Sequence, residues 1–266
     1  LETEKTATAL EEALSSFRTF IAQTEEATNL PEAHFDLGRC LHELKRFDDA
    51  VKAFDVLKDQ YPNSPQAKDA LYQIGWAYKS NNNSQKSLEA FNKFVDTQPD
   101  SKNAPLGCLL IGEFQYQKEQ FEEAITNYRK GIKLIRDQAL KGQIGDQALK
   151  GQILYRLGWA LKVTKQFDEA SNAFEKVMAT QARPSLKADA RFRMGSIAFE
   201  RKNFALAAGH FRSVLKKFPD TDEAPEAAHS LGECLNSMGQ FLDAEKTLRQ
   251  LLNDKPAKAL AAKTRV

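Results

Sequence analysis

Few side chains in this chain of 266 residues have the types and spacing that chemistry requires. His34 and His42 fall in one expected helix and could in principle form a pair of metal ligands. No cysteine or carboxylate near them completes the spacing of a four-coordinate zinc site. We therefore expect no metal and no cofactor, and we expect every histidine to be a solvated surface residue: His34, His42, His210 and His229.

Paired carboxylates could serve as a general acid and a general base at three places: Asp48-Asp49, Glu122-Glu123 and Asp168-Glu169. Each pair falls where we expect the first turn of a helix, and acidic side chains there offset the helix dipole. The glycine-rich residues 142–151 lack the lysine and the strand–helix context of a phosphate-binding loop. Because no nucleophile stands beside a base, the sequence predicts a protein that is not an enzyme.

The elements that carry these side chains follow a recurring glycine. Its spacings are 37, 37, 46, 37 and 37 residues, at Gly38, Gly75, Gly112, Gly158, Gly195 and Gly232. An alanine or serine stands twelve residues after each glycine, and a large apolar or aromatic residue stands sixteen after it: Phe54, Phe91, Tyr128, Phe174, Phe211 and Leu248. A fixed period of this size indicates a repeat array, in which each unit buries its apolar face against its neighbours.

Each period is typical of a hairpin of two helices. Ala50, Phe54 and Leu57 follow the i, i+4, i+7 spacing of one helical face. A glycine inside a helix costs about 1 kcal/mol relative to alanine, so a repeated one indicates close helix packing, with the large residue filling the space beyond. Four units carry a proline that ends the second helix, at Pro62, Pro99, Pro219 and Pro256.

These coupled positions resemble the tetratricopeptide repeat family. The resemblance implies an all-α, right-handed α-solenoid of helix–turn–helix repeats, in which first helices line a concave groove. The links between hairpins, such as YPNSPQAKDA and FPDTDEAPEA, resemble those of bacterial cell-envelope members of the family, including the Tol–Pal-associated periplasmic protein and the β-barrel assembly lipoprotein. We expect a single solenoid over 1–266, with 1–29 as the second helix of a truncated repeat. The repeats are expected at 31–67, 68–104, 105–150, 151–187, 188–224 and 225–261.

The 46-residue spacing arises from a duplication, because DQALKGQI occurs at 137–144 and again at 146–153. Nine extra residues rotate a helix by about 900°, half a turn out of phase. We therefore expect Gly142, Gly145 and Gly151 to break the helix, with the surplus in an extended second helix or a protruding loop. The insertion is interpreted either as a tandem duplication absorbed between units or as a protrusion that docks a partner.

Charge and cysteine content exclude some classes of protein. A net charge of +2 with 28% charged residues and no basic cluster argues against a nucleic-acid partner. The sequence also has no apolar run long enough to span a membrane, so we expect no membrane insertion. Cys40, Cys108 and Cys234 lie far apart in the array and should be free, largely buried thiols. Free thiols favour the cytoplasm, whereas the links favour the periplasm or cell envelope. The chain begins at Leu1, so we expect a fragment or processed part of a larger protein or complex.

The resemblance also implies where a partner would bind. In this family, groove residues stand near three before, one after and four after the repeat glycine, and both tryptophans of the chain directly follow that glycine. Aromatic and arginine side chains are favoured anchors at interfaces. The predicted partner-binding residues are Phe35, Arg39, Tyr72, Trp76, Lys79, Tyr116, Tyr155, Arg156, Trp159, Lys162, Phe192, Arg193 and Phe199.

We therefore expect a scaffold for protein–protein interaction that binds a peptide or a partner protein in the concave groove, in bacterial envelope assembly. Two other functions stay open. A glycan-binding module would expose Trp76 and Trp159 as flat platforms. A structural spacer without a groove ligand would bury the aromatic residues between units.

Overall fold

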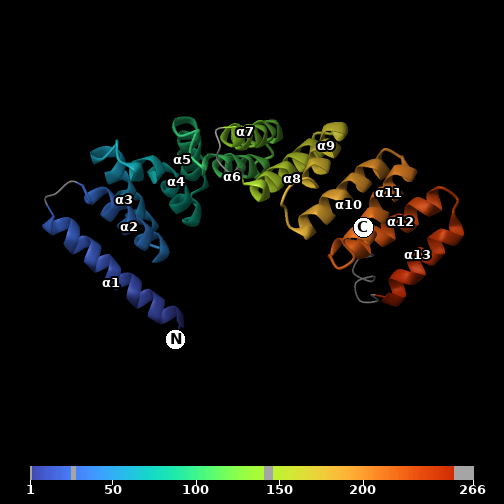
Figure 1. Cartoon of the computed structure of the whole chain (residues 1–266), viewed down its shortest axis with the longest axis horizontal. Helices are drawn as coiled ribbons and strands as arrows, with labels where there is room; N and C mark the ends of the chain where they lie inside the picture. Colours follow the sequence, from blue (N-terminus) through green and yellow to red (C-terminus); the bar gives the residue numbers. More distant parts are fainter. Residues whose placement is uncertain (1, 25–27, 141–145, 255–266) are drawn as a thin grey trace. The chain divides into compact units, whose positions relative to one another are not determined.

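The computed structural model describes residues 2–24, 28–140 and 146–254, and these residues form helices joined by short turns, with no strand among them (Figure 1). In chain order the described helices are α1 (Glu2–Gln23), α2 (Leu30–Glu43), α3 (Phe47–Gln60), α4 (Pro65–Ser80), α5 (Ser84–Thr97), α6 (Ala104–Gln117), α7 (Phe121–Leu140), α8 (Gln147–Val163), α9 (Phe167–Val177), α10 (Pro184–Glu200), α11 (Phe204–Lys217), α12 (Glu223–Ser237) and α13 (Phe241–Asp254). The predicted all-α fold of helical hairpins is confirmed.

The chain divides into two compact units, residues 1–114 and 115–266, with the boundary inside α6. In the first unit, α1 packs on α2, α2 on α3, α3 on α4 and α4 on α5. In the second, α7 packs on α8, α8 on α9, and the same order continues to α13. A first helix also contacts the first helix of the next hairpin, as α2 contacts α4 and α10 contacts α12. The predicted repeat boundaries and the single solenoid over the whole chain stay a prediction.

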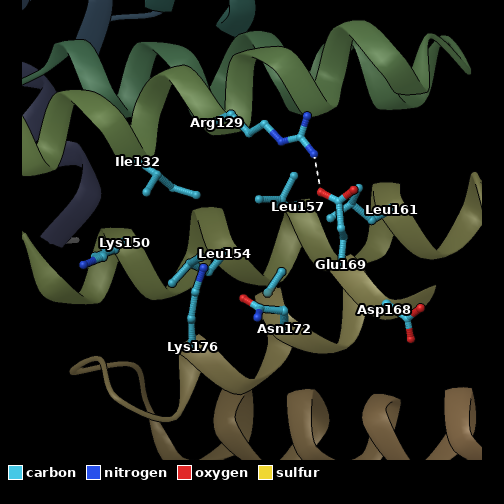
Figure 2. A pocket seen from close by; sticks show the side chains of 11 residues that line it. Arg129, Ile132, Lys150, Leu154, Leu157, Leu161, Asp168, Glu169, Asn172 and Lys176 are labelled. Carbon is cyan, nitrogen blue, oxygen red and sulfur yellow. Dashed lines mark hydrogen bonds and ion pairs between the residues drawn. The ribbon is translucent and has the colours of Figure 1, made fainter. Parts of the chain in front are cut away.

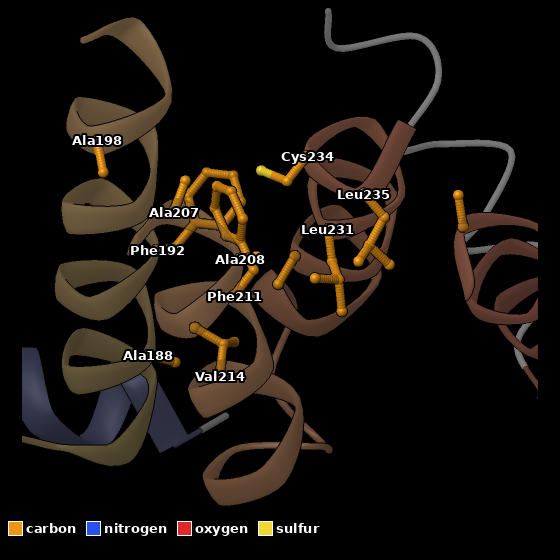
Figure 3. Packing of buried hydrophobic residues seen from close by; sticks show 12 residues of the cluster. Ala188, Phe192, Ala198, Ala207, Ala208, Phe211, Val214, Leu231, Cys234 and Leu235 are labelled. Atoms are coloured by element: carbon orange, nitrogen blue, oxygen red, sulfur yellow. The ribbon is translucent and has the colours of Figure 1, made fainter. Parts of the chain in front are cut away.

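The repeat glycines let the two helices of a hairpin approach closely. A Cβ added at Gly158 would lie 2.6 Å from the ring of Phe174, and one added at Gly195 would lie 2.6 Å from the ring of Phe211. Both rings are buried, and Figure 3 shows Phe211 packed among Phe192, alanines and Cys234. The predicted pairing of a small residue with a large one is confirmed in each unit, because the same close approach joins Gly38 to Phe54 and Gly75 to Phe91.

The turn between the two helices of a hairpin uses a left-handed residue. Seven residues after each repeat glycine, φ lies between 55° and 75°, at Lys45, Asn82, Glu119, Lys165, Lys202 and Gly239. Non-glycine residues in this region cost about 1 kcal/mol or more. Four of the six positions carry a lysine or a glutamate, residue types that rarely adopt this conformation. Helix packing therefore imposes the turn at these positions, because the local residue type does not favour it.

Capping residues fix where helices begin. Ser64 accepts a hydrogen bond from the Ala67 amide at 3.1 Å, and Pro65 follows as the first residue of α4. Asn203 accepts one from the Leu206 amide at 3.2 Å at the start of α11. The three acidic pairs lie in the first turns of α3, α7 and α9, as expected for side chains that offset the helix dipole.

The duplicated segment lengthens α7, which has 20 residues, whereas α5 has 14. An extended second helix was one of the two forms expected for the insertion. Gly151 does not break a helix, so that prediction is wrong: it lies inside α8, where a Cβ would meet the Thr180 hydroxyl oxygen at 2.6 Å. Gly151 therefore provides space for the segment that follows α9. Gly142 and Gly145 lie outside the described residues.

The histidines are less exposed than the sequence suggested. His34 and His210 are half-buried, and burial lowers the pKa of each imidazole. His42 and His229 are half-buried as well, so the expectation that all four histidines are solvated surface residues is wrong. Within the described ranges, no group of three or more side chains could hold a metal ion, and none of the described helices is long and apolar enough to cross a membrane.

The cysteines are free thiols. Cys108 and Cys234 are buried and Cys40 is partly exposed, which confirms the expectation for all but the last. Burial raises the pKa of Cys234 to about 11, so its thiolate population at neutral pH is negligible.

Candidate partner-binding surfaces

In the first unit, Trp76 is the centre of a small aromatic and cationic cluster on α4. The Tyr72 and Trp76 ring centroids are 6.2 Å apart, and Phe91 of α5 lies 6.0 Å from each of these two rings. The Lys79 amine lies 4.8 Å from the indole centroid. Trp76 is consequently half-buried, with a cation over its ring.

The second unit repeats this arrangement on α8. Tyr155 lies 6.4 Å from Trp159 between ring centroids, and the Lys162 amine lies 5.5 Å from the indole centroid. Helix α10 adds a second cation here, because the Arg193 guanidinium lies 4.7 Å from the same centroid. Trp159 is therefore contacted by cations from two successive first helices.

Asp189 on α10 holds this second cluster together. Its carboxylate accepts hydrogen bonds from the Tyr155 hydroxyl and from Arg193 Nε, the latter at 2.9 Å. Burial, followed by the hydrogen bond to Asp189 and its negative charge, raises the pKa of Tyr155 to about 12. The shared carboxylate holds Arg193 against the indole, so the surface is organised before any partner arrives.

Asp189 was missed by the sequence analysis. The signal available was its spacing of four residues before Arg193, which on a helix brings an aspartate and an arginine to one face. That spacing identifies an ion pair but not the tyrosine that joins it from another helix.

Most of the other predicted partner-binding residues pack inside their own hairpins. Three residues before the glycine, Phe35 contacts Phe54 at 5.7 Å between centroids, and Phe192 is only 8% exposed. Four residues after the glycine, Tyr116 contacts Phe121 at 5.2 Å and Phe199 contacts Phe204 at 5.3 Å.

The remaining two predicted residues are arginines with exposed side chains. Arg39 pairs with Asp36 at 3.6 Å, and Arg156 is exposed on α8. The structure thus gathers three predicted residues in the first unit, Tyr72, Trp76 and Lys79, and four in the second, Tyr155, Trp159, Lys162 and Arg193. Their role in binding stays a prediction.

A pocket of about 600 Å³ lies on a different face of the second unit, and no predicted residue lines it. It opens between α7, α8 and α9 (Figure 2). Its lining consists of Arg129, Ile132, Lys150, Leu154, Leu157, Leu161, Asp168, Glu169, Asn172, Ala173 and Lys176.

Two protein-family models match this chain. One, described as a tetratricopeptide repeat, matches residues 7–65. The other, described as "YfiO: Outer membrane lipoprotein", matches residues 38–251. The chain belongs to the YfiO family. Both resemblances predicted from the sequence, to tetratricopeptide repeats and to bacterial envelope members, are confirmed.

Solved structures similar to this YfiO-family chain share its fold at low sequence identity. The C-terminal part of a TPR repeat-containing protein from Cytophaga hutchinsonii is 17% identical with a TM-score of 0.70, covering 97% of this chain and 95% of that one. The apo form of RapI is 12% identical with a TM-score of 0.66, covering 96% and 80%. YrrB, described as a TPR protein with an unusual peptide-binding site, is 18% identical with a TM-score of 0.56, covering 80% and 99%.

No curated protein matches the sequence. Tetratricopeptide proteins are generally non-enzymatic scaffolds that bind protein or peptide partners, and the family match and the fold support a role of this kind for the chain.

Proposed function

We propose that the second unit of this chain binds a peptide segment of a partner protein across the cluster of Tyr155, Trp159, Lys162, Asp189 and Arg193. The observation that carries the proposal is the shared carboxylate of Asp189, which fixes Tyr155 and Arg193 around the indole before binding. Side chains held in place lose little entropy when a ligand arrives, and that saving raises affinity.

The chemistry of the cluster defines the kind of segment that it suits. Asp189 is already neutralised by Arg193, so the cation left over is Lys162 above the indole. A segment that places an aliphatic or aromatic side chain against Trp159 and a backbone carbonyl or carboxylate near Lys162 satisfies both groups. The Trp76 cluster offers the same tyrosine, tryptophan and lysine in the first unit, and we propose that it binds in the same way.

The family match supports a cellular setting for this binding, the bacterial envelope. Because the matching family is described as outer membrane lipoproteins, we propose that the partner is a component of bacterial envelope assembly. We also keep the proposal that the hairpins form one solenoid, so that both tryptophan clusters belong to one repeating series.

Two observations weigh on the alternative functions. A sugar platform needs a free indole face, whereas a lysine or an arginine already lies over each tryptophan ring. The aromatic residues that pack within hairpins, such as Phe35 and Phe199, suit a spacer equally well. The decision between a binding surface and a spacer therefore depends on the tryptophan clusters.

The proposal is tested by selecting peptides from a random display library on the whole chain and measuring their affinity by fluorescence anisotropy. We expect Trp159→Ala to weaken binding about tenfold or more, as removal of a central anchor does. Leu206→Ala is the matched control, since Leu206 is an exposed apolar residue (51%) on α11 outside the cluster.

A capture experiment from an envelope extract, with wild-type chain beside the Trp76→Ala, Trp159→Ala variant, extends the test to natural partners. If the folded double variant recovers the same proteins, and the selected peptides bind the single variant with unchanged affinity, the groove proposal is wrong.

A further inference from the structure

The pocket between α7, α8 and α9 uses a face of α8 that the tryptophan cluster leaves free. Leu154, Leu157 and Leu161 recur at helical spacing and form its floor, whereas Tyr155 and Trp159 lie on another side of the helix. Its volume of about 600 Å³ falls within the range of ligand-binding pockets. Figure 2 shows the leucines between the side chains of α7 and those of α9.

The next hairpin has the same framework, but the chain fills that groove itself. Thirty-seven residues after Leu154 stands Arg191, and thirty-seven after Ala173 stands His210. The Arg191 side chain is only 13% exposed, with Nη1 2.8 Å from Glu175 Oε2. The same nitrogen is 3.5 Å from His210 Nδ1. The smaller leucine and alanine leave the corresponding space around α8 open.

One charged position of the filled groove has the opposite sign in the open one. The position of Glu175 is held by Arg129, 46 residues earlier across the nine-residue insertion. Arg129 reaches Glu169 at 2.6 Å, and Asp168 pairs with Arg201, so both acidic side chains of the pocket are neutralised. No ion pair joins Lys150 or Lys176 to another described residue. The unneutralised charge of the pocket is therefore positive.

We propose that this pocket is a second binding site, which takes an acidic and aliphatic segment of a partner protein. A glutamate or aspartate side chain of the partner enters the space that Arg191 fills one hairpin later. Its carboxylate accepts hydrogen bonds from the Lys176 and Lys150 amines, and its aliphatic neighbours cover Leu154 and Leu157. Charge-assisted hydrogen bonds of this kind are roughly twice as strong as neutral ones.

The filled groove itself supplies the variant that tests the proposal. The triple substitution Arg129→Glu, Leu154→Arg and Ala173→His copies Glu175, Arg191 and His210 into the pocket. It should fold, because the same three groups already pack in the neighbouring hairpin. Lys176→Gln removes one of the two unneutralised cations and leaves the pocket open.

Peptides are selected from a random display library on the Trp76→Ala, Trp159→Ala chain, so that the tryptophan clusters do not compete. We expect the selected peptides to carry an acidic residue beside aliphatic ones and to lose affinity about tenfold when that residue is changed to its amide. The triple substitution should abolish their binding, Lys176→Gln should weaken it, and Leu206→Ala should leave it unchanged.

Selection of only neutral or basic peptides, of peptides that bind the triple variant equally well, or of none overturns the proposal. Dimerisation of the wild-type chain that the triple variant prevents would also overturn it, since a second copy would then be the occupant. These outcomes are separate from failure of the tryptophan groove, because the selecting chain lacks both indoles.

Discussion

Substituting Gly158 by alanine should destabilise the second unit, although alanine is the better helix former. An added Cβ would lie 2.6 Å from Cε1 of Phe174. Carbon atoms in contact normally stand about 3.5–4.0 Å apart, so the ring or helix α9 has to move by roughly 1 Å. The ring is buried with no exposed surface, which leaves it no free space.

The magnitude follows from two opposing terms. Replacing a helical glycine by alanine contributes about 1 kcal/mol of helix propensity, whereas overpacking a core typically costs about 1–3 kcal/mol. Gly209 in α11 separates these terms, because a Cβ added there meets nothing within 4 Å. Gly209→Ala should therefore stabilise the chain by up to about 1 kcal/mol. The free energy of unfolding of Gly158→Ala should be about 1–3 kcal/mol lower than that of Gly209→Ala.

The assay is urea denaturation of the whole chain, followed by far-ultraviolet circular dichroism. The unfolding midpoints of wild type, Gly158→Ala and Gly209→Ala are compared, together with the slopes of the transitions. A double-mutant cycle with Phe174→Leu completes the test, because a smaller side chain should reduce the cost of the added methyl group.

Equal stabilisation by the two alanine substitutions would refute the reasoning. The reasoning would also be refuted if Gly158→Ala lowered the free energy of unfolding equally with phenylalanine and with leucine at residue 174. Either result would mean that the repeated glycine serves some purpose other than close packing of the hairpin.

Three further predictions concern particular side chains. Burial, followed by the charge of Arg191, lowers the pKa of His210 in the folded chain. The unfolded chain therefore binds a proton at this histidine more readily, and stability is lost as pH falls through about 6.5. His210→Gln should make the melting temperature fall less between about pH 7 and pH 5, and an unchanged dependence of melting temperature on pH would contradict this. Asp189→Asn should lower the pKa of Tyr155 from about 12, while burial, the largest cause of its raised pKa, keeps it above the ordinary value. Absorbance titration, with a Tyr155→Phe chain as the reference, measures this pKa. An unaltered pKa would exclude the hydrogen bond between Tyr155 and Asp189. Lys165→Gly removes the side chain from a residue at φ 61° and should raise stability by up to about 1 kcal/mol. Gly239→Ala places a Cβ at φ 75° and should lower stability by a similar amount. Thermal unfolding measures the change in stability of each variant, and changes of the same sign would refute the argument.

The hairpin was predictable because its determinants repeat in one dimension. The spacing of Gly195, Ala207 and Phe211 recurs in the other repeats, and helical periodicity converts that spacing into one packed face. The two tryptophans were predictable as a cluster for the same reason, since tyrosine and lysine stand at fixed distances on the same helix.

The remainder depends on which side chain of one hairpin meets which side chain of another. Asp189 joins Tyr155 through a hydrogen bond between α10 and α8, which no single-helix pattern contains. Gly151 is predicted to break a helix because the sequence pattern does not show what it packs against. Its neighbour Thr180, which leaves no room for a Cβ, lies 29 residues further along the chain. The pocket was hidden because it results from small side chains at positions that larger ones fill elsewhere.

The left-handed turns have a consequence for folding. Lys45, Glu119, Lys165 and Lys202 hold a backbone conformation that their own residue types disfavour. Helices α10 and α11 pack on each other and also on α9 and α12. A peptide comprising α10 and α11 alone keeps only part of this packing, so it should tend to open at Lys202. Cooperativity should accordingly extend over several hairpins, and a truncation that removes one of them should loosen the corner of the next.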